Sequence, residues 1–329
     1  MTVMQKILGA AATLAITASG ALAEPAIIYD LGGKFDKSFN EAGFGGATKW
    51  AEETGDSFRE FEIQSEAQRE QALRRFAENG NDPIVMMGFA FASSLDTVAQ
   101  DFPDTKFVII DMVVDQPNVR SVIFNEQEGS FLVGVAAAMA SKSNTVGFIG
   151  GMDIPLIRNF ACGYVQGVKA TNPDATVIQN MTGTTPAAWN DPVKGAELTK
   201  AQIAQGADVV YAAAGGTGVG VLQTAADEGI FSIGVDSNQN YLFPGQVLTS
   251  MLKRVDVAVF NAFSEGPELE TGLQVLGLAN GGIDYALDEF NANVMTAEIV
   301  AAVDAAKADI ISGALKVHNY NSDNNCPIM

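Results

Sequence analysis

Three aspartates that end short apolar runs are the residues of this sequence best placed to do chemistry. Asp30 follows the run 26–29, Asp111 closes the run 106–110, and Asp236 follows the run 231–235. An ionised carboxylate offers only acceptors and can take two donors at once, which suits vicinal hydroxyls or the N–H groups of a heterocyclic base. The alternative interpretation of Asp111 and Asp236 is that each caps a helix or closes a turn.

Two aromatic residues could form the walls of a site for a flat ring. Phe39 lies in the first turn of a helix predicted after Ser38, a candidate N-cap, and Trp189 lies in a loop ahead of another predicted helix. Stacking of a base on such side chains contributes about 1–3 kcal/mol per base. The alternatives are that Asp36 and Ser38 cap the helix while Phe39 fills the core, and that Trp189 covers a lobe edge.

A glycine-rich turn and one lysine complete the candidate set. The turn at 215–218 begins with Gly215 and reads GGTG, and its backbone amides could hold an anion or a polar ligand oxygen. The turn lacks the Gly-Lys-Ser/Thr ending of a nucleotide P-loop, so a tight turn that packs strand on helix is the default interpretation. Lys253 ends the run 246–252 and could add one positive donor, although an isolated lysine is usually a surface charge.

The composition excludes several kinds of chemistry. His318 is the only histidine among 329 residues, so Ser-His-Asp catalysis and multi-histidine metal sites lack parts. We assign His318 no role, and we expect no catalytic residue, no metal and no cofactor. Cys162 and Cys326 are too few for a zinc ribbon. Because Cys162 lies on an apolar helical face, we expect a buried free thiol, with a disulfide to Cys326 as the alternative.

The charge excludes two classes of partner. The formal charge is −20 and the isoelectric point is near 4.3. Nucleic acids and anionic membranes both bind clusters of lysine and arginine, so we expect neither as a partner of this acidic chain.

The first 23 residues are typical of a signal peptide. Lys6 gives a positive start, residues 7–18 form a mostly apolar run, and Ala-Leu-Ala at 21–23 precedes Glu24. We expect cleavage of residues 1–23 and a mature periplasmic protein that begins near Glu24. A transmembrane anchor is the alternative, but the run is short and is interrupted by threonines. No cysteine follows the run, so we expect no lipid anchor.

The remaining chain alternates short apolar runs with longer segments of helical period, which is typical of parallel sheets. The runs form two series of five, and each series predicts one doubly wound lobe. Ligands bind such sheets at the carboxyl ends of the strands, where the aspartates above are found. The predicted strands are 26–29, 58–63, 83–88, 106–111 and 119–124, then 145–150, 175–180, 208–213, 231–235 and 246–252.

Five segments in order resemble a known family. They are DKSFN at 36–40, FVIID at 107–111, EGSFLVG at 128–134, VGFIGGM at 146–152 and AGGTG at 214–218. Each segment alone is weak, but together they span most of residues 26–255. The ordered set resembles the basic membrane protein family of ABC-transporter substrate-binding proteins, which includes purine nucleoside receptors.

The resemblance implies a type I periplasmic-binding fold of class α/β. In this fold, two doubly wound parallel-sheet lobes are joined by three hinge crossings and close on a ligand. The crossings are expected near Asn125, near Lys253 and within 273–286. The implied parts are an N-terminal lobe of 24–125 plus about 254–280, a C-terminal lobe of 126–253 plus about 281–315, and a C-terminal tail of 316–329 that we expect to be loose.

The resemblance also implies roles for single residues. In nucleoside-binding members, a base stacks between two aromatic rings while acidic residues and a lysine bind its edge and its ribose hydroxyls. By position, Asp30 resembles the carboxylate at the base edge, and Phe39 and Trp189 resemble the two rings. The implied ligand-binding residues are Asp30, Phe39, Asn40, Trp189 and Gly215, together with a ribose set of Asp111, Asp236 and Lys253.

We therefore predict the solute-binding protein of an ABC importer, a monomer that delivers a purine nucleoside or nucleobase to the membrane subunits of a permease. Three aspartates against one lysine leave the predicted pocket at −2, which repels a phosphate and favours a neutral, donor-rich ligand. A sugar or a flavin is the alternative ligand. A nucleoside-cleaving enzyme is less favoured, because its calcium site needs aspartates closer together than Asp30 and Asp36.

Overall fold

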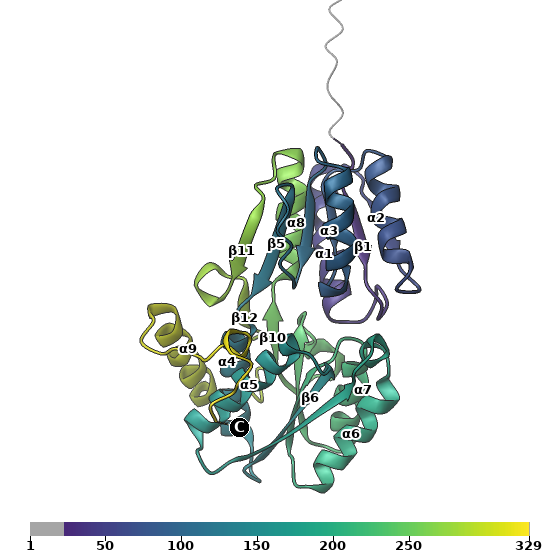
Figure 1. Ribbon diagram of the computed structural model, residues 1–329. Helices are drawn as coiled ribbons and strands as arrows, with labels where there is room; N and C mark the ends of the chain where they lie inside the picture. The colour runs from purple at the N-terminus through teal and green to yellow at the C-terminus, as the bar shows by residue number, and fades with distance from the viewer. Residues whose placement is uncertain (1–22, 329) are drawn as a thin grey trace, which may run out of the picture.

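The chain folds into two α/β lobes, one above the other in Figure 1. The computed structural model describes residues 23–328. Residues 1–22 of the predicted signal peptide therefore lie outside the described residues. Within this part of the chain, each lobe is built around a sheet of six strands. The predicted two-lobe α/β fold is confirmed. Between residues 23 and 328, no helix is both long enough and apolar enough to span a bilayer.

The N-terminal lobe has a parallel sheet with the strand order β11-β5-β4-β3-β1-β2. Helices α1 (Phe39–Thr54) and α8 (Val255–Glu265) cover one face of this sheet, and α2 (Gln68–Glu78) and α3 (Ala92–Asp101) cover the other. The strands are β1 Ala26–Tyr29, β2 Arg59–Glu62, β3 Ile84–Met86, β4 Phe107–Ile110, β5 Val119–Phe124 and β11 Gly272–Leu276.

The residues of β1 show why both faces of the sheet are covered. Successive side chains of a strand point to opposite faces. Ile27 and Tyr29 pack with α1 and α8, whereas Ala26 and Ile28 pack with α2 and α3. A strand that is apolar at every position therefore has to lie between two helical layers.

The C-terminal lobe has the strand order β12-β10-β9-β8-β6-β7, with only the β10–β12 pair antiparallel among the described strands. Its strands are β6 Thr145–Met152, β7 Thr176–Gly183, β8 Val209–Ala213, β9 Phe231–Asp236, β10 Val247–Lys253 and β12 Ile283–Tyr285. Its helices are α4 Glu126–Ala140, α5 Pro155–Thr171, α6 Pro192–Ala204, α7 Thr217–Asp227 and α9 Ala297–Ser312.

The chain passes between the two sheets at three places in residues 23–328. It leaves the N-terminal sheet after β5 to form α4, returns after β10 to form α8, and leaves again between β11 and β12. The ends of β5 and β10 therefore lie next to the cleft between the lobes.

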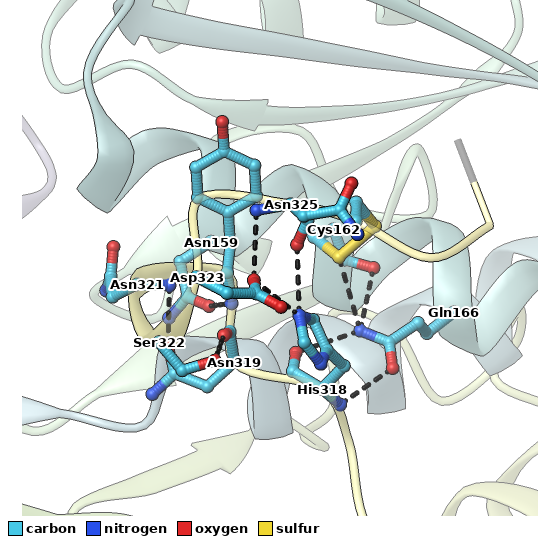
Figure 2. The surroundings of a disulfide bond; sticks show 11 residues. Asn159, Cys162, Gln166, His318, Asn319, Asn321, Ser322, Asp323 and Asn325 are labelled. Atoms are coloured by element: carbon cyan, nitrogen blue, oxygen red, sulfur yellow. Dashed lines mark hydrogen bonds and ion pairs between the residues drawn. A yellow bond between two sulfur atoms is a disulfide. The ribbon is translucent and has the colours of Figure 1, made fainter.

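The C-terminal tail is not loose, and Cys162 is not a free thiol. Cys162 of α5 forms a disulfide with Cys326, 164 residues further along the chain. Figure 2 shows that the tail around His318 lies against α5. The prediction failed because apolar patterning places Cys162 on a buried face but cannot show that a polar tail covers that face.

Glycines let α4 and α5 pack with their backbones in contact. A Cβ atom at Gly167 would overlap the carbonyl group of Phe131, and one at Gly163 would overlap the backbone of Gln127. Because α5 also lines the cleft, this close contact fixes the position of one cleft wall.

We expect Gly167→Ala to lower the free energy of unfolding by about 1–3 kcal/mol, since the added methyl group meets rigid backbone rather than a flexible side chain. Urea denaturation followed by circular dichroism measures the change. Gly45→Ala is the matched control, because Gly45 is exposed in α1 and has open space around it. It should stabilise the protein by about 0.5–1 kcal/mol. Equal effects of the two substitutions would contradict this account of the α4–α5 contact.

Candidate functional site

The candidate site is a cavity of about 80 Å³ between the lobes, at the carboxyl ends of the strands. A larger hollow of about 690 Å³ lies on the N-terminal lobe between β2 and α2, away from the predicted residues. The structure brings all eight predicted ligand-binding residues to the cavity between the lobes. They are Asp30, Phe39, Asn40, Asp111, Trp189, Gly215, Asp236 and Lys253.

Lys253 is the centre of the charges in the cavity. Its Nζ atom lies 2.6 Å from Asp111 Oδ2 and 3.7 Å from Glu126 Oε1, and the residue is 2% exposed. Burial lowers the pKa of Lys253, but Asp111, Glu126 and Asp236 outweigh this effect and raise the pKa above its usual value. Lys253 is therefore a buried cation whose charge depends on its carboxylate neighbours. The rings within 6 Å of Nζ are those of Phe39, Phe124 and Phe160.

Two buried acceptors at the cavity have no donor within the described residues, Asp111 Oδ1 and Asn40 Oδ1. The Nδ2 atom of Asn40 donates to the carbonyl oxygens of Asp30 and Gly33, both at 3.2 Å, and this fixes the orientation of the amide. An unsatisfied buried acceptor costs about 1–3 kcal/mol. A ligand that donates hydrogen bonds to both atoms would recover that cost.

Asp30 is held by an arginine that the sequence analysis did not select. Asp30 Oδ1 accepts hydrogen bonds from Arg69 Nη2 at 2.8 Å, Arg69 Nε at 3.2 Å and the N–H of Leu31 at 2.8 Å. Burial raises the pKa of Asp30, and Arg69 partly opposes that shift. All these bonds use Oδ1. The other carboxylate oxygen of Asp30, Oδ2, lies beside Gly88, and both residues line the cavity.

Ser38 joins the two lobes instead of capping α1. It occupies the N-cap position, but its hydroxyl makes no capping hydrogen bond. The carboxylate of Asp36 caps the helix, accepting from the N–H groups of Ser38, Asn40 and Glu41. The Ser38 hydroxyl instead donates to Asp236 Oδ2 in the other lobe. The prediction was wrong because helix propensity cannot reveal a partner 198 residues away.

The aspartates at the ends of β4 and β9 share an unusual backbone conformation. The φ angle is 70° at Asp111 and 62° at Asp236. Residues other than glycine adopt this left-handed region at a cost of about 1–3 kcal/mol, although aspartate tolerates it better than most. The same strained placement in both lobes turns one carboxylate from each lobe toward the cleft.

Glycines position Trp189 in the cleft. Trp189 ends a short 3-10 helix, η2 (Pro186–Trp189), which is held to the start of α7 by the Thr217 hydroxyl, donating to the Ala188 carbonyl at 2.8 Å. A Cβ atom at Gly151 would overlap the indole, and Gly215 has a φ angle of 55°. The ring contacts of the described residues do not include a Phe39–Trp189 pair, so these two rings are not stacked on each other.

Several site residues had no usable signal in the sequence. Arg69 reaches Asp30 from α2, 39 residues away, and Glu126 is buried beside Lys253 at the start of α4. Glu126 is an acidic residue at a lobe crossing, and this position was the only available hint. Phe160 and two other apolar residues of α5, Leu156 and Ile157, also line the cavity.

Comparison with known proteins gives consistent matches over most of the chain. A family model described as PnrA-like ABC transporter substrate-binding protein matches residues 26–321. The ABC transporter nucleoside-binding protein BmpA of Lactococcus lactis subsp. cremoris is 34% identical over 318 residues, covering 89% of this chain and 88% of that protein. A solute-binding protein of an ABC transporter system from Aeropyrum pernix superposes with a TM-score of 0.80 at 30% identity, covering 89% of this chain and 92% of that chain.

The expectation that the protein has no lipid anchor is contradicted by relatives from Pyrococcus. One of them, from Pyrococcus furiosus, is named as a lipoprotein and is 33% identical over 278 residues, covering 79% of this chain and 69% of that protein. The expectation rested on the residues that follow the apolar run near the N-terminus. Relatives that carry lipoprotein names overturn it.

The buried carboxyls make stability depend on pH. Burial raises the pKa of Asp36 and of Glu126 to about 7 from 3.8 and 4.5. A carboxyl with a raised pKa binds more protons in the folded state than in the unfolded state. The free energy of unfolding therefore falls as pH rises from the ordinary pKa values, 3.8 and 4.5, to about 7.

We therefore expect the melting temperature of the ligand-free protein to fall between pH 5 and pH 7.5, by about 2–4 °C for each kcal/mol lost from the free energy of unfolding. Differential scanning calorimetry measures the profile, and Glu126→Gln should flatten it. A melting temperature that rises across this window would contradict the assignment of raised pKa values to Asp36 and Glu126.

Proposed function

Because the chain belongs to the family of PnrA-like ABC transporter substrate-binding proteins, we propose that its cavity binds a purine nucleoside or nucleobase. The loaded protein then delivers this ligand to the membrane subunits of an ABC importer. The relative from Lactococcus lactis is named for nucleoside binding, which supports this choice of ligand.

The charge of the cavity favours a neutral ligand rich in donors. Four aspartates line it, Asp30, Asp36, Asp111 and Asp236, against Lys253 and against Arg69, which pairs with Asp30 from behind the lining. Excess carboxylates attract hydroxyl and N–H groups, and they repel a phosphate. A nucleoside meets this requirement, whereas a nucleotide does not.

The two rings favour a planar ligand. Phe39 comes from the N-terminal lobe and Trp189 from the C-terminal lobe, so a ring held between them touches both lobes at once. Two stacking faces at about 1–3 kcal/mol each and charged hydrogen bonds at about 1.5–3 kcal/mol each are sufficient for micromolar affinity, about −8 kcal/mol, after association costs.

Binding also requires the lobes to move. The cavity of about 80 Å³ is below the roughly 300–1,000 Å³ usual for ligand pockets. A nucleoside therefore enters after the lobes separate about the three chain passages, and the lobes close again on it. Ligand hydroxyls that donate to Asp111 Oδ1 leave the contact of Lys253 with Oδ2 in place.

The observation that carries the proposal is the pair of buried acceptors without donors, Asp111 Oδ1 and Asn40 Oδ1, between two aromatic walls. A thermal-shift screen with adenosine, guanosine, inosine, their bases, sugars and flavins tests it. We expect a rise in melting temperature with at least one purine nucleoside or base. The nucleoside should be recovered intact by chromatography, since the proposal includes no bond cleavage. A response to sugars alone would contradict the proposal.

We expect Phe39→Ala and Trp189→Ala each to weaken nucleoside binding at least about tenfold, because each removes one stacking face. Isothermal titration calorimetry measures the affinities, and circular dichroism checks the fold. Phe35→Ala is the matched control, because Phe35 is 63% exposed and does not line the cavity. Unchanged affinity in Phe39→Ala and Trp189→Ala would show that neither ring stacks on the ligand.

We expect Asp236→Ala to weaken guanosine binding more than guanine binding, because the proposed role of Asp236 is to accept ribose hydroxyls. Ser38→Ala is the control, since it removes the hydroxyl that donates to Asp236 but keeps the carboxylate. It should affect both ligands equally. Calorimetric titration of both ligands measures the difference, and equal losses in Asp236→Ala would show that the ribose role is wrong.

A further inference from the structure

The C-terminal tail, residues 316–328, is bound to helix α5 by more than the disulfide. Gln166 makes a pair of hydrogen bonds with the backbone of His318, donating from Nε2 to its carbonyl at 3.0 Å and accepting its N–H at 2.8 Å. These contacts lie beside the Cys162–Cys326 bond in Figure 2. The tail is therefore a fixed layer on the C-terminal lobe.

Asn159 connects this tail to helix α4. Its side chain is 0% exposed, and its Oδ1 atom accepts the N–H of Tyr320 at 3.0 Å. Its Nδ2 atom donates to Glu126 Oε2 at 3.0 Å and to Gln127 Oε1 at 2.9 Å. Both donor positions and the acceptor of this amide are occupied, so its orientation is fixed from two sides.

Helix α5 presents one face to the tail and another to the cavity. Asn159, Cys162 and Gln166 follow the spacing i, i+3, i+7 of one helical face. Leu156, Ile157 and Phe160 line the cavity, and the Phe160 ring centroid is 5.6 Å from Lys253 Nζ. A change on the tail side of α5 therefore lies one helix away from the cavity wall.

Glu126 carries the connection into the cavity. It is 1% exposed, and its Oε1 atom lies 3.7 Å from Lys253 Nζ while its Oε2 atom accepts from Asn159. The polar contacts thus run without interruption from the Tyr320 N–H through Asn159 and Glu126 to Lys253.

We propose that Asn159 is a positioning residue of the ligand cavity, held in place by the disulfide-anchored tail and acting through Glu126 on Lys253. Loss of the disulfide frees the segment around Cys326, which leaves only hydrogen bonds at His318 and Tyr320 to hold the tail, so we expect the contact of the Tyr320 N–H with Asn159 to weaken. Glu126 then loses a fixed donor, and Lys253 loses a fixed second carboxylate. The effect on ligand affinity rests on the proposed function.

The first test compares guanosine affinities of the unmodified protein, Cys326→Ser and Asn159→Leu by isothermal titration calorimetry. We expect a loss of about fivefold or more in both variants. Lys169→Ala is the matched control on α5, because Lys169 contacts the Pro173 carbonyl and not the tail, and it should bind normally. Equal affinity in all four proteins would overturn the positioning role.

The pH profile of binding separates positioning from a general loss of stability. The charged or titratable groups that face Glu126 are Lys253 from β10, Asp111 beyond β4 and Tyr211 from β8. The Asn159 hydrogen bond lowers the pKa of Glu126 against the larger effect of burial, which raises it. Because ionised Glu126 is the second carboxylate that holds Lys253, guanosine affinity should rise with pH as Glu126 ionises. In Asn159→Leu, Glu126 should ionise at higher pH, so this rise should move to higher pH. An unshifted profile would contradict the route through Glu126.

Hydrogen–deuterium exchange of ligand-free protein tests the tail without any assumption about function. We expect faster exchange in residues 126–131 and 155–162 of Cys326→Ser than in the unmodified protein. If guanosine binds no protein but exchange changes as expected, the proposed ligand is wrong and the positioning role of the tail survives. Unchanged exchange in both segments would overturn the inference, whatever guanosine does.

Discussion

The structure of the cleft depends on one buried ion pair, Lys253 with Asp111. A buried charge that lacks a partner costs several kcal/mol, so a lysine that is 2% exposed requires carboxylates around it. Asp111 follows β4 in the N-terminal lobe and Lys253 ends β10 in the other lobe, so their 2.6 Å contact also holds the lobes together. Both groups line the cavity, and Asp111 Oδ1 is an acceptor that we propose a ligand engages. The ion pair therefore contributes to lobe closure together with the hydrogen bond from Ser38 to Asp236.

The remaining site residues follow from the fold that surrounds this pair. Parallel sheets bring the carboxyl ends of their strands to one edge, and the two lobes face each other along these edges. Asp111 and Asp236 occupy comparable strand ends with φ angles of 70° and 62°. Glycine at 151 leaves room for the Trp189 indole. The result is a cleft that is lined by aspartates and by the aromatic side chains of Phe39 and Trp189.

The sequence could predict the residues whose positions depend on strand ends. Alternating apolar runs placed Asp30, Asp111 and Asp236 at one edge, and all three line the cavity. Patterning also predicted the two lobes, since a strand that is apolar on both faces must lie between helices. The family resemblance supplied the proposed roles of Phe39, Trp189 and Lys253, for which residue types alone left alternatives open.

The sequence could not predict contacts that depend on how distant segments pack. Arg69 contacts Asp30 across 39 residues, Ser38 contacts Asp236 across 198, and Cys162 pairs with Cys326 across 164. No local pattern encodes such pairs. The most direct test of the central claim, an acidic cleft for a neutral planar ligand, is calorimetric titration with guanosine and with guanosine 5′-monophosphate. The account predicts micromolar or tighter binding of the nucleoside and none of the nucleotide, and binding of the nucleotide with equal affinity would contradict it.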